Sequence, residues 1–219
     1  MNYIDSIINT INSISGKYSS YEVFSDWIKC GSLMYSNQTD FIHGKLWQKR
    51  EQTYIDTMKR YSLEERKKLV EMFGILAMAM EQEITDVLGT VYMKGNMGSK
   101  ATGQFFTPFH ISRMVAEVGI PKDISPQNPL ILNEPSAGGG GMILAAARVL
   151  KDRGLNPQKC MDVTAQDLDW KGVYMTYLQL SVLGIKATVI QGNTLAEPYG
   201  KGYPSERVLY TPARKGLIL

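Results

Sequence analysis

After Pro108 the chain alternates short apolar runs with longer segments of helical spacing, and this alternation constrains the fold more than any other feature. The candidate strands are residues 129–135 (PLILNEP), 161–167 (MDVTAQD), 186–193 (KATVIQGN) and 206–212 (ERVLYTP). The candidate helices are residues 110–120, 141–150 and 170–184. Strands that alternate with helices in this way predict an α/β sheet with right-handed crossover connections.

The part of the chain before this alternation has a different pattern. Isoleucines recur at helical spacing in the first fourteen residues, and Ser62 with Glu65 forms a capping box that opens a long helix. The glycine-rich segment 94–108 (KGNMGSKATGQFFTP) is typical of a loop and marks a boundary. The sequence therefore predicts a helical N-terminal domain at residues 1–100 and an α/β domain at residues 101–219.

Charge and composition narrow the function only slightly. The net charge of +3 permits a nucleic-acid partner without requiring one. The basic stretch at residues 45–68 fits either a DNA-facing pair of helices or a solvated helical surface. Cys30 and Cys160 lie far apart, and no metal-binding pattern is present, so we expect no metal site. Neither a leader nor a long apolar run is found, which predicts a cytoplasmic protein without membrane contact.

Residues 133–144 read NEPSAGGGGMIL, with four glycines between a candidate strand and a candidate helix. This run could hold a phosphate, hold an adenosine-containing cofactor, or form only a tight turn. No Gly-Lys-Ser/Thr follows, so it is not a P-loop, and it fits the dinucleotide fingerprint poorly. A glycine turn before a helix still lets a ligand approach the backbone and directs helix N–H groups at it.

Two polar residues end the next strands along the chain. Asp167 ends the second strand, and in doubly wound folds an acid at that place accepts hydrogen bonds from ribose hydroxyls. Asn193 ends the third strand. Because parallel strands end at one edge of a sheet, the glycine run, the acid and the amide together predict a nucleoside pocket.

These segments resemble a known family. GQFFTP (103–108), NEPSAGGGGMIL, AQDLD (165–169) and QGNTL (191–195) are similar, in this order, to the motifs of adenine-N6 DNA methyltransferases. The likeness is strongest to the HsdM-like modification subunits of type I restriction–modification systems, and the helical first hundred residues resemble their N-terminal domain. The resemblance implies a Rossmann-like class I methyltransferase sheet, S-adenosylmethionine (SAM) as cofactor and DNA as substrate.

The resemblance also implies roles for individual residues. The segment Phe106, Thr107 and Pro108 would flank the methionine end of SAM. The cofactor loop would comprise Glu134, Pro135, Gly138 and Gly140. Asp167 would hold the ribose, its neighbour Leu168 would also bind the cofactor, and Asn193 would contact the adenine ring.

The chain departs from the family in the motif that holds the target base. The family uses an Asn/Asp-Pro-Pro-aromatic tetrapeptide after the fourth strand, whose polar oxygens accept the two N–H bonds of the adenine amine. Here Thr211 and Pro212 occupy the first two places of that slot, followed by Ala213 and Arg214. Thr211 and Pro212 are therefore the predicted, degenerate catalytic residues.

Two functions follow as hypotheses. The first is a SAM-dependent DNA adenine-N6 methyltransferase, or a truncated or divergent relative of one. The alternative is a catalytically inactive subunit that keeps the SAM fold and docks with restriction–modification proteins. Family members continue with further strands, so the sheet is expected to be incomplete, with an edge that a second copy or a partner subunit covers.

Overall fold

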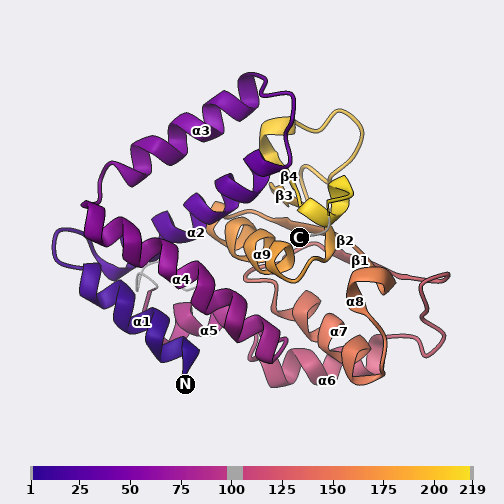
Figure 1. Cartoon of the computed structure of the whole chain (residues 1–219). Coiled ribbons are helices and arrows are strands. Elements are labelled where there is room, and N and C mark those ends of the chain that lie inside the picture. Colours follow the sequence, from indigo (N-terminus) through magenta and orange to yellow (C-terminus); the bar gives the residue numbers. More distant parts are fainter. Residues whose placement is uncertain (1, 98–105, 218–219) are drawn as a thin grey trace.

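The computed structural model describes residues 2–97 and 106–217 (Figure 1). The helices are α1 (Tyr3–Ile14), α2 (Ser20–Gln38), α3 (Lys45–Met58), α4 (Leu63–Gln82), α5 (Val87–Lys94), α6 (Phe109–Gly119), α7 (Gly141–Asp152), α8 (Pro157–Cys160) and α9 (Trp170–Val182). The strands are β1 (Leu130–Glu134), β2 (Met161–Asp167), β3 (Lys186–Gln191) and β4 (Val208–Tyr210), and the 3-10 helices are η1 (Ser205–Arg207) and η2 (Pro212–Lys215). This mixed architecture confirms the predicted α/β class.

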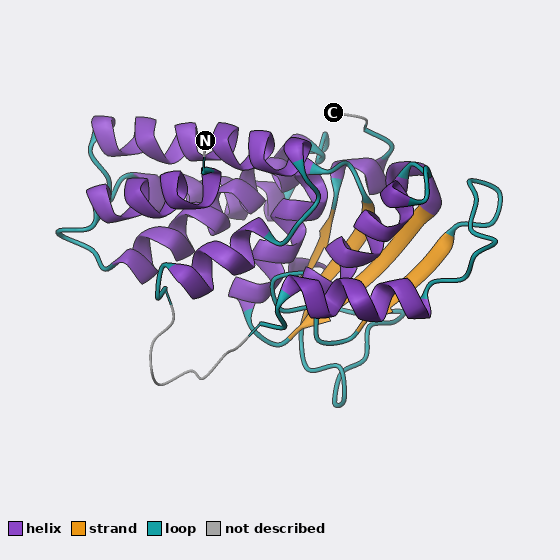
Figure 2. Cartoon of the chain, turned by 90° about the horizontal axis from the view of Figure 1, so that it is seen from below, coloured by secondary structure: helices purple, strands orange, loops and turns teal. Residues whose placement is uncertain are grey.

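Helices α1 to α5 form the first part of the chain and lie beside the sheet (Figure 2). The isoleucine spacing predicts α1, whose Ile7, Ile11 and Ile14 are buried. The capping box at α4 is present, because the Ser62 hydroxyl accepts from the Glu65 amide and the Glu65 carboxylate accepts from the Ser62 amide. Such reciprocal capping stabilises a helix start by roughly 1 kcal/mol.

The sheet has the order β1-β2-β3-β4. Strands β1, β2 and β3 are parallel, and α7 and α9 are the crossover helices between them. Strand β4 pairs antiparallel with β3, in register Ile190↔Val208. No crossover helix lies between β3 and β4 in the described chain, so β4 returns as an antiparallel strand instead of extending the parallel sheet.

Within the described residues, β1 pairs only with β2 and leaves its other edge open. Ile131 on this strand is 74% exposed. One edge of the sheet is therefore open at β1 within the described residues, and its covering by a second copy or a partner stays a prediction. No helix in the described ranges combines the length and apolar character that crossing a bilayer requires.

The side chain of Gln179 joins the first helices to the sheet-bearing part. It is fully buried in α9, donates to the Asp86 carboxylate (3.0 Å) and the Gly139 carbonyl (2.8 Å), and accepts from the Leu88 amide (3.0 Å). The helices and the sheet also share one continuous apolar core. The boundary predicted between residues 100 and 101 lies outside the described residues, and the two-domain division stays a prediction.

Replacing Gln179 with methionine is expected to lower the free energy of unfolding by about 3 kcal/mol or more, because three buried partners lose their hydrogen bonds. Urea denaturation measures this loss. The exposed Gln52, which bonds only to Asp56 within α3, provides the control: Gln52→Met should change stability by about 0.5 kcal/mol or less. An equal, small effect of both changes would contradict the role given to Gln179.

Candidate functional site

The glycine run and Asp167 meet at the carboxyl edge of the parallel strands. The register pairs Glu134 with Ala165 and Asp167 with Gln191, so the three strands end together. The Gly138 amide donates to Asp167 Oδ2 at 2.7 Å, and the Asp169 amide donates to Asp167 Oδ1 at 2.8 Å. The structure therefore brings together the loop and the acid that the sequence places at neighbouring strand ends.

The conformation of the loop requires glycine. Gly138 has φ +53° and Gly140 has φ +89°, both in the left-handed region that side chains disfavour. A Cβ atom at Gly138 would lie 3.0 Å from the Phe106 ring, and one at Gly141 would lie 3.3 Å from Asp86 Oδ2. Helix α7 begins here without a side-chain cap, so its first amides are available to a ligand.

A cavity of about 230 Å³ opens beside this loop. Its lining comprises Asp86, Phe106, Thr107, Ser112, Ser136, Ala137, Gly138, Gly139, Gly141, Met142 and Asp167. Four of the sequence-predicted residues are among these: Phe106, Thr107, Gly138 and Asp167. The cavity is bounded by segments from both parts of the chain, since Asp86 precedes α5 and Phe106 precedes α6.

Asp86 is an acidic residue of this cavity that the sequence analysis did not single out. It is 4% exposed, and its Oδ1 accepts from the Gly89 amide (2.8 Å) and from the Gln179 amide group (3.0 Å). No donor among the described residues bonds to its Oδ2, which faces Gly139 and Gly141. Burial raises the pKa of this carboxyl, because the charged form loses water.

Ser112 contributes a second polar atom without a partner. Its side chain on α6 is fully buried, and its hydroxyl makes no hydrogen bond within the described structure. Buried hydroxyl groups are nearly always hydrogen-bonded, so Ser112 and Asp86 together indicate a place for a ligand that donates hydrogen bonds.

The other predicted cofactor residues lie near the cavity without lining it. Glu134 accepts from the Ser136 amide (3.0 Å), and the Pro135 carbonyl accepts from the Thr194 hydroxyl (2.6 Å), so both hold the turn after β1. Asn193 accepts from the Leu195 and Ala196 amides. Pro108 is the N-cap residue of α6. A Cβ atom at Gly140 would lie 3.1 Å from the Thr176 hydroxyl oxygen. The side chain of Leu168 is 65% exposed.

Thr211 and Pro212 are not at this edge. Thr211 donates to the Ile185 carbonyl (2.8 Å) and accepts from the Ala187 amide (2.9 Å), which places it at the amino end of β3, opposite the glycine loop. Both residues are buried. The hydroxyl of Thr211 thus already forms hydrogen bonds with backbone groups of the chain. The structure does not bring Thr211 and Pro212 to the glycine-loop cavity.

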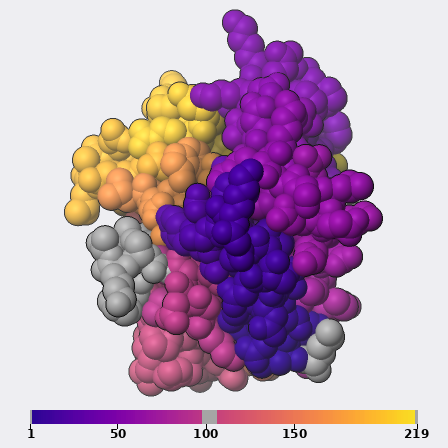
Figure 3. Space-filling view, turned by 90° about the vertical axis from the view of Figure 1, so that its left-hand side faces the viewer, coloured from indigo at the N-terminus to yellow at the C-terminus, as the bar shows by residue number. Residues whose placement is uncertain are grey.

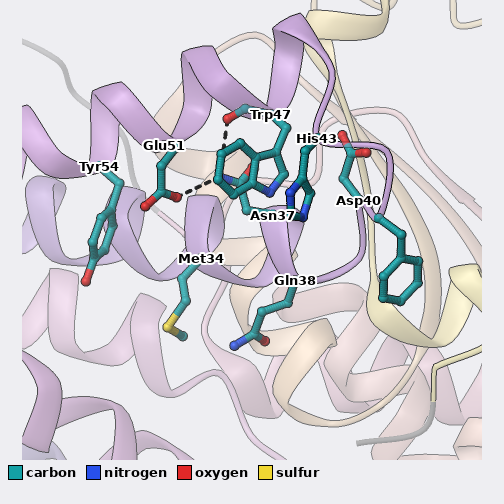
Figure 4. Close-up of a pocket in the computed structure, with 9 residues that line it drawn as sticks. Met34, Asn37, Gln38, Asp40, His43, Trp47, Glu51 and Tyr54 are labelled. Carbon is teal, nitrogen blue, oxygen red and sulfur yellow. Dashed lines mark hydrogen bonds between the residues drawn. The ribbon is translucent and has the colours of Figure 1, made fainter.

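A separate cavity of about 450 Å³ lies between α2 and α3 (Figure 4). Its walls include Trp47, stacked on His43 with ring centroids 4.3 Å apart, and the carboxylates of Asp40 and Glu51. None of the sequence-predicted site residues lines it. In the described ranges, no group of three or more His, Cys, Asp or Glu residues is arranged to hold a metal ion.

Comparison with known proteins was made on sequence and on structure. The model of a family described as N-6 DNA methylase matches residues 84–210, a range that includes Asp86, the glycine loop and Asp167. A search of curated proteins finds no match.

Similar solved structures include a protein from Listeria monocytogenes described as a class I S-adenosylmethionine-dependent methyltransferase, with 11% identity and a TM-score of 0.46. They also include the type I restriction–modification system methyltransferase subunit from Streptococcus thermophilus, with 17% identity and a TM-score of 0.45. The alignments cover 88% and 92% of this chain, but only 54% and 41% of those proteins.

Proposed function

Because the chain belongs to the N-6 DNA methylase family, we propose that it binds SAM at the glycine loop and serves methyl transfer to N6 of adenine in DNA. When bound, SAM would supply a methyl group on a sulfonium: the adenine amine would attack the methyl carbon, the carbon–sulfur bond would break, and S-adenosylhomocysteine and a proton would leave, with no covalent enzyme intermediate. The observation that carries the proposal is the 2.7 Å contact between the Gly138 amide and Asp167 at the mouth of a polar cavity.

The groups in the cavity suit the charges of this cofactor. SAM carries an ammonium, a carboxylate, a sulfonium and ribose hydroxyls, but no phosphate. Asp86 Oδ2 and the Ser112 hydroxyl would accept from the ammonium, and the first amides of α7 would bind the carboxylate. Asp167 already accepts two amide bonds, and a carboxylate has about four acceptor positions, so it can also accept from ribose hydroxyls.

A second function is favoured by one observation. Thr211 and Pro212 lie at the amino end of β3, so the chain's own candidates for holding the adenine amine are away from the glycine loop. No Asn/Asp-Pro-Pro-aromatic tetrapeptide occurs elsewhere in the sequence. These facts favour a cofactor-binding or regulatory subunit that does not transfer the methyl group by itself.

The open edge of β1 suits a partner. We propose that a second copy or another subunit covers this edge, because its backbone groups are unpaired within the described residues and Ile131 is exposed. Such a partner would supply the side chains that hold the target adenine.

Transfer of labelled methyl groups from SAM into DNA distinguishes the two functions. If the chain labels DNA and the Asp167→Ala variant does not, the methyltransferase function is supported. SAM binding in a titration, without incorporation, supports the regulatory subunit. If the chain neither binds SAM nor labels DNA, both functions are wrong.

A further inference from the structure

Arg50 in α3 is a nearly buried cation that donates no hydrogen bond to any described residue. Its side chain is 12% exposed, and its contact with a carboxylate, among the described residues, is a distance of 3.9 Å from Nη1 to Asp40 Oδ2. Burial lowers the pKa of Arg50, because the guanidinium loses water and no hydrogen bond to a described residue replaces it. Arginine nevertheless remains charged at neutral pH.

This situation sets Arg50 apart from the chain's other arginines. Each of the others, all in the described part, donates at least one side-chain hydrogen bond: Arg60, Arg66, Arg113, Arg148, Arg153, Arg207 and Arg214. A desolvated charge with no hydrogen-bond partner is costly to the folded state. Its position therefore suggests that an anion is the missing partner.

Arg50 lines two cavities. One, of about 370 Å³, also contacts Lys49, Trp170, Tyr174 and Arg207. The other, of about 350 Å³, also contacts Asp40 and Lys215. Both cavities lie where α3 meets the segment 205–215. In Figure 3, C-terminal residues, in yellow, lie beside residues of the helical part of the chain, in purple.

The lining combines positive charge with an aromatic surface. Lysines and arginines outnumber the acids Asp40 and Glu206 among the residues that line the two cavities. Trp170 and Tyr174 stack with ring centroids 5.1 Å apart and an interplanar angle of 28°, and both are half-buried. Basic grooves with stacking aromatic rings are the usual surfaces for unpaired nucleic-acid strands.

We propose that Arg50 binds a phosphate of an unpaired DNA strand, and that a base of the same strand stacks on Trp170. A cavity of about 370 Å³ is large enough for a nucleotide unit. Lys49 lines one of the two cavities and Lys215 lines the other, so each cavity holds a further cation beside Arg50. The choice of DNA as ligand rests on the proposed function; the need for an anion at Arg50 does not.

The test measures binding of a fluorescein-labelled dT12 oligonucleotide by fluorescence anisotropy at low salt. Arg50→Met should weaken binding by about 10-fold or more, because a buried charge-assisted hydrogen bond contributes about 1.5–3 kcal/mol. The melting temperature of this variant should stay unchanged or rise, since the substitution removes a nearly buried charge whose carboxylate contact, to Asp40, is 3.9 Å long. Trp170→Leu should also weaken the binding.

Controls separate this site from general charge effects. Lys67 lies in the same basic stretch but is 59% exposed on α4, so Lys67→Met should leave oligonucleotide affinity unchanged within about 2-fold. Inorganic phosphate at the same phosphate concentration should not displace the oligonucleotide; displacement would show a simple anion site and overturn the inference.

A failure of the inference about Arg50 can be distinguished from a failure of the proposed function. Binding of SAM to Arg50→Met should equal that of the unchanged chain, because Arg50 does not line the glycine-loop cavity. Equal oligonucleotide affinity in Arg50→Met and the unchanged chain would overturn the inference, whether or not SAM binds.

Discussion

Replacing Asp167 with alanine is expected to lower the affinity for SAM by about 100-fold or more. The change removes the acceptor for the Gly138 and Asp169 amides and the acceptor proposed for the ribose hydroxyls. Hydrogen bonds to a charged group contribute about 1.5–3 kcal/mol each, and 1.4 kcal/mol corresponds to about 10-fold in affinity. Isothermal titration with SAM or S-adenosylhomocysteine measures the effect.

Asp162 offers the matched control. It is a carboxylate on the same strand, but it lies at the opposite edge of the sheet, where it pairs with Lys186 and Arg214. Asp162→Ala should leave the affinity within about 2-fold, because only bonds away from the cavity are lost. Equal losses in both variants would indicate general destabilisation and would contradict a specific role for Asp167.

The second large effect is expected from Asp86→Asn. This change removes the charge proposed to bind the ammonium of SAM, while an amide of the same shape keeps an acceptor for the Gly89 amide and for Gln179. The affinity for SAM should fall by about 10-fold or more. The affinity for 5′-methylthioadenosine, which has no ammonium, should stay unchanged, and an equal loss for both ligands would show that Asp86 only shapes the loop.

The raised pKa of Asp86 also predicts how pH acts. Between the ordinary and the raised pKa, the folded chain binds a proton that the unfolded chain has released. The contribution of Asp86 to stability is therefore greatest at low pH and declines as pH rises through this window. SAM binding should change in the opposite direction, strengthening with pH as Asp86 ionises, and Asp86→Asn should abolish both dependences.

The meeting of the glycine run and Asp167 could be predicted, because it depends only on the order of the strands in the sheet. Asp167 and the glycine run lie at the ends of neighbouring parallel strands, and such ends meet at one edge of a sheet whatever the details of packing. The same holds for local signals, such as the Ser62–Glu65 capping box. The family resemblance stated from these motifs is confirmed by the match over residues 84–210.

The role of Asp86 could not be predicted in this way. In the sequence it is an acid before a helix, which is typical of an N-cap, and it does cap α5. Its position opposite Gly139 and Gly141 arises from the packing of the first helices against α9, which no local pattern encodes. The burial of Arg50 could not be predicted for the same reason, because in the sequence Arg50 is one cation within a basic stretch.

Thr211 shows how the direction of a strand decides where the residue after it lies. The sequence places it after a fourth strand, in the slot that the resemblance assigns to holding the target base. Here β4 runs antiparallel to β3, so the residue after it lies at the opposite edge. The direction of a short strand depends on the connection before it, and no crossover helix precedes β4 in the described chain.

The central claim is that one adenosyl ligand binds between the glycine loop and Asp167. Titration of isotope-labelled protein with S-adenosylhomocysteine, followed by NMR amide shifts, tests it most directly. The largest shifts are predicted at residues 137–142 and 167–169, beside the cavity that Asp86 also lines. Absence of shifts at saturating ligand, or shifts confined to Trp47 and its neighbours in the α2–α3 cavity, would contradict the claim.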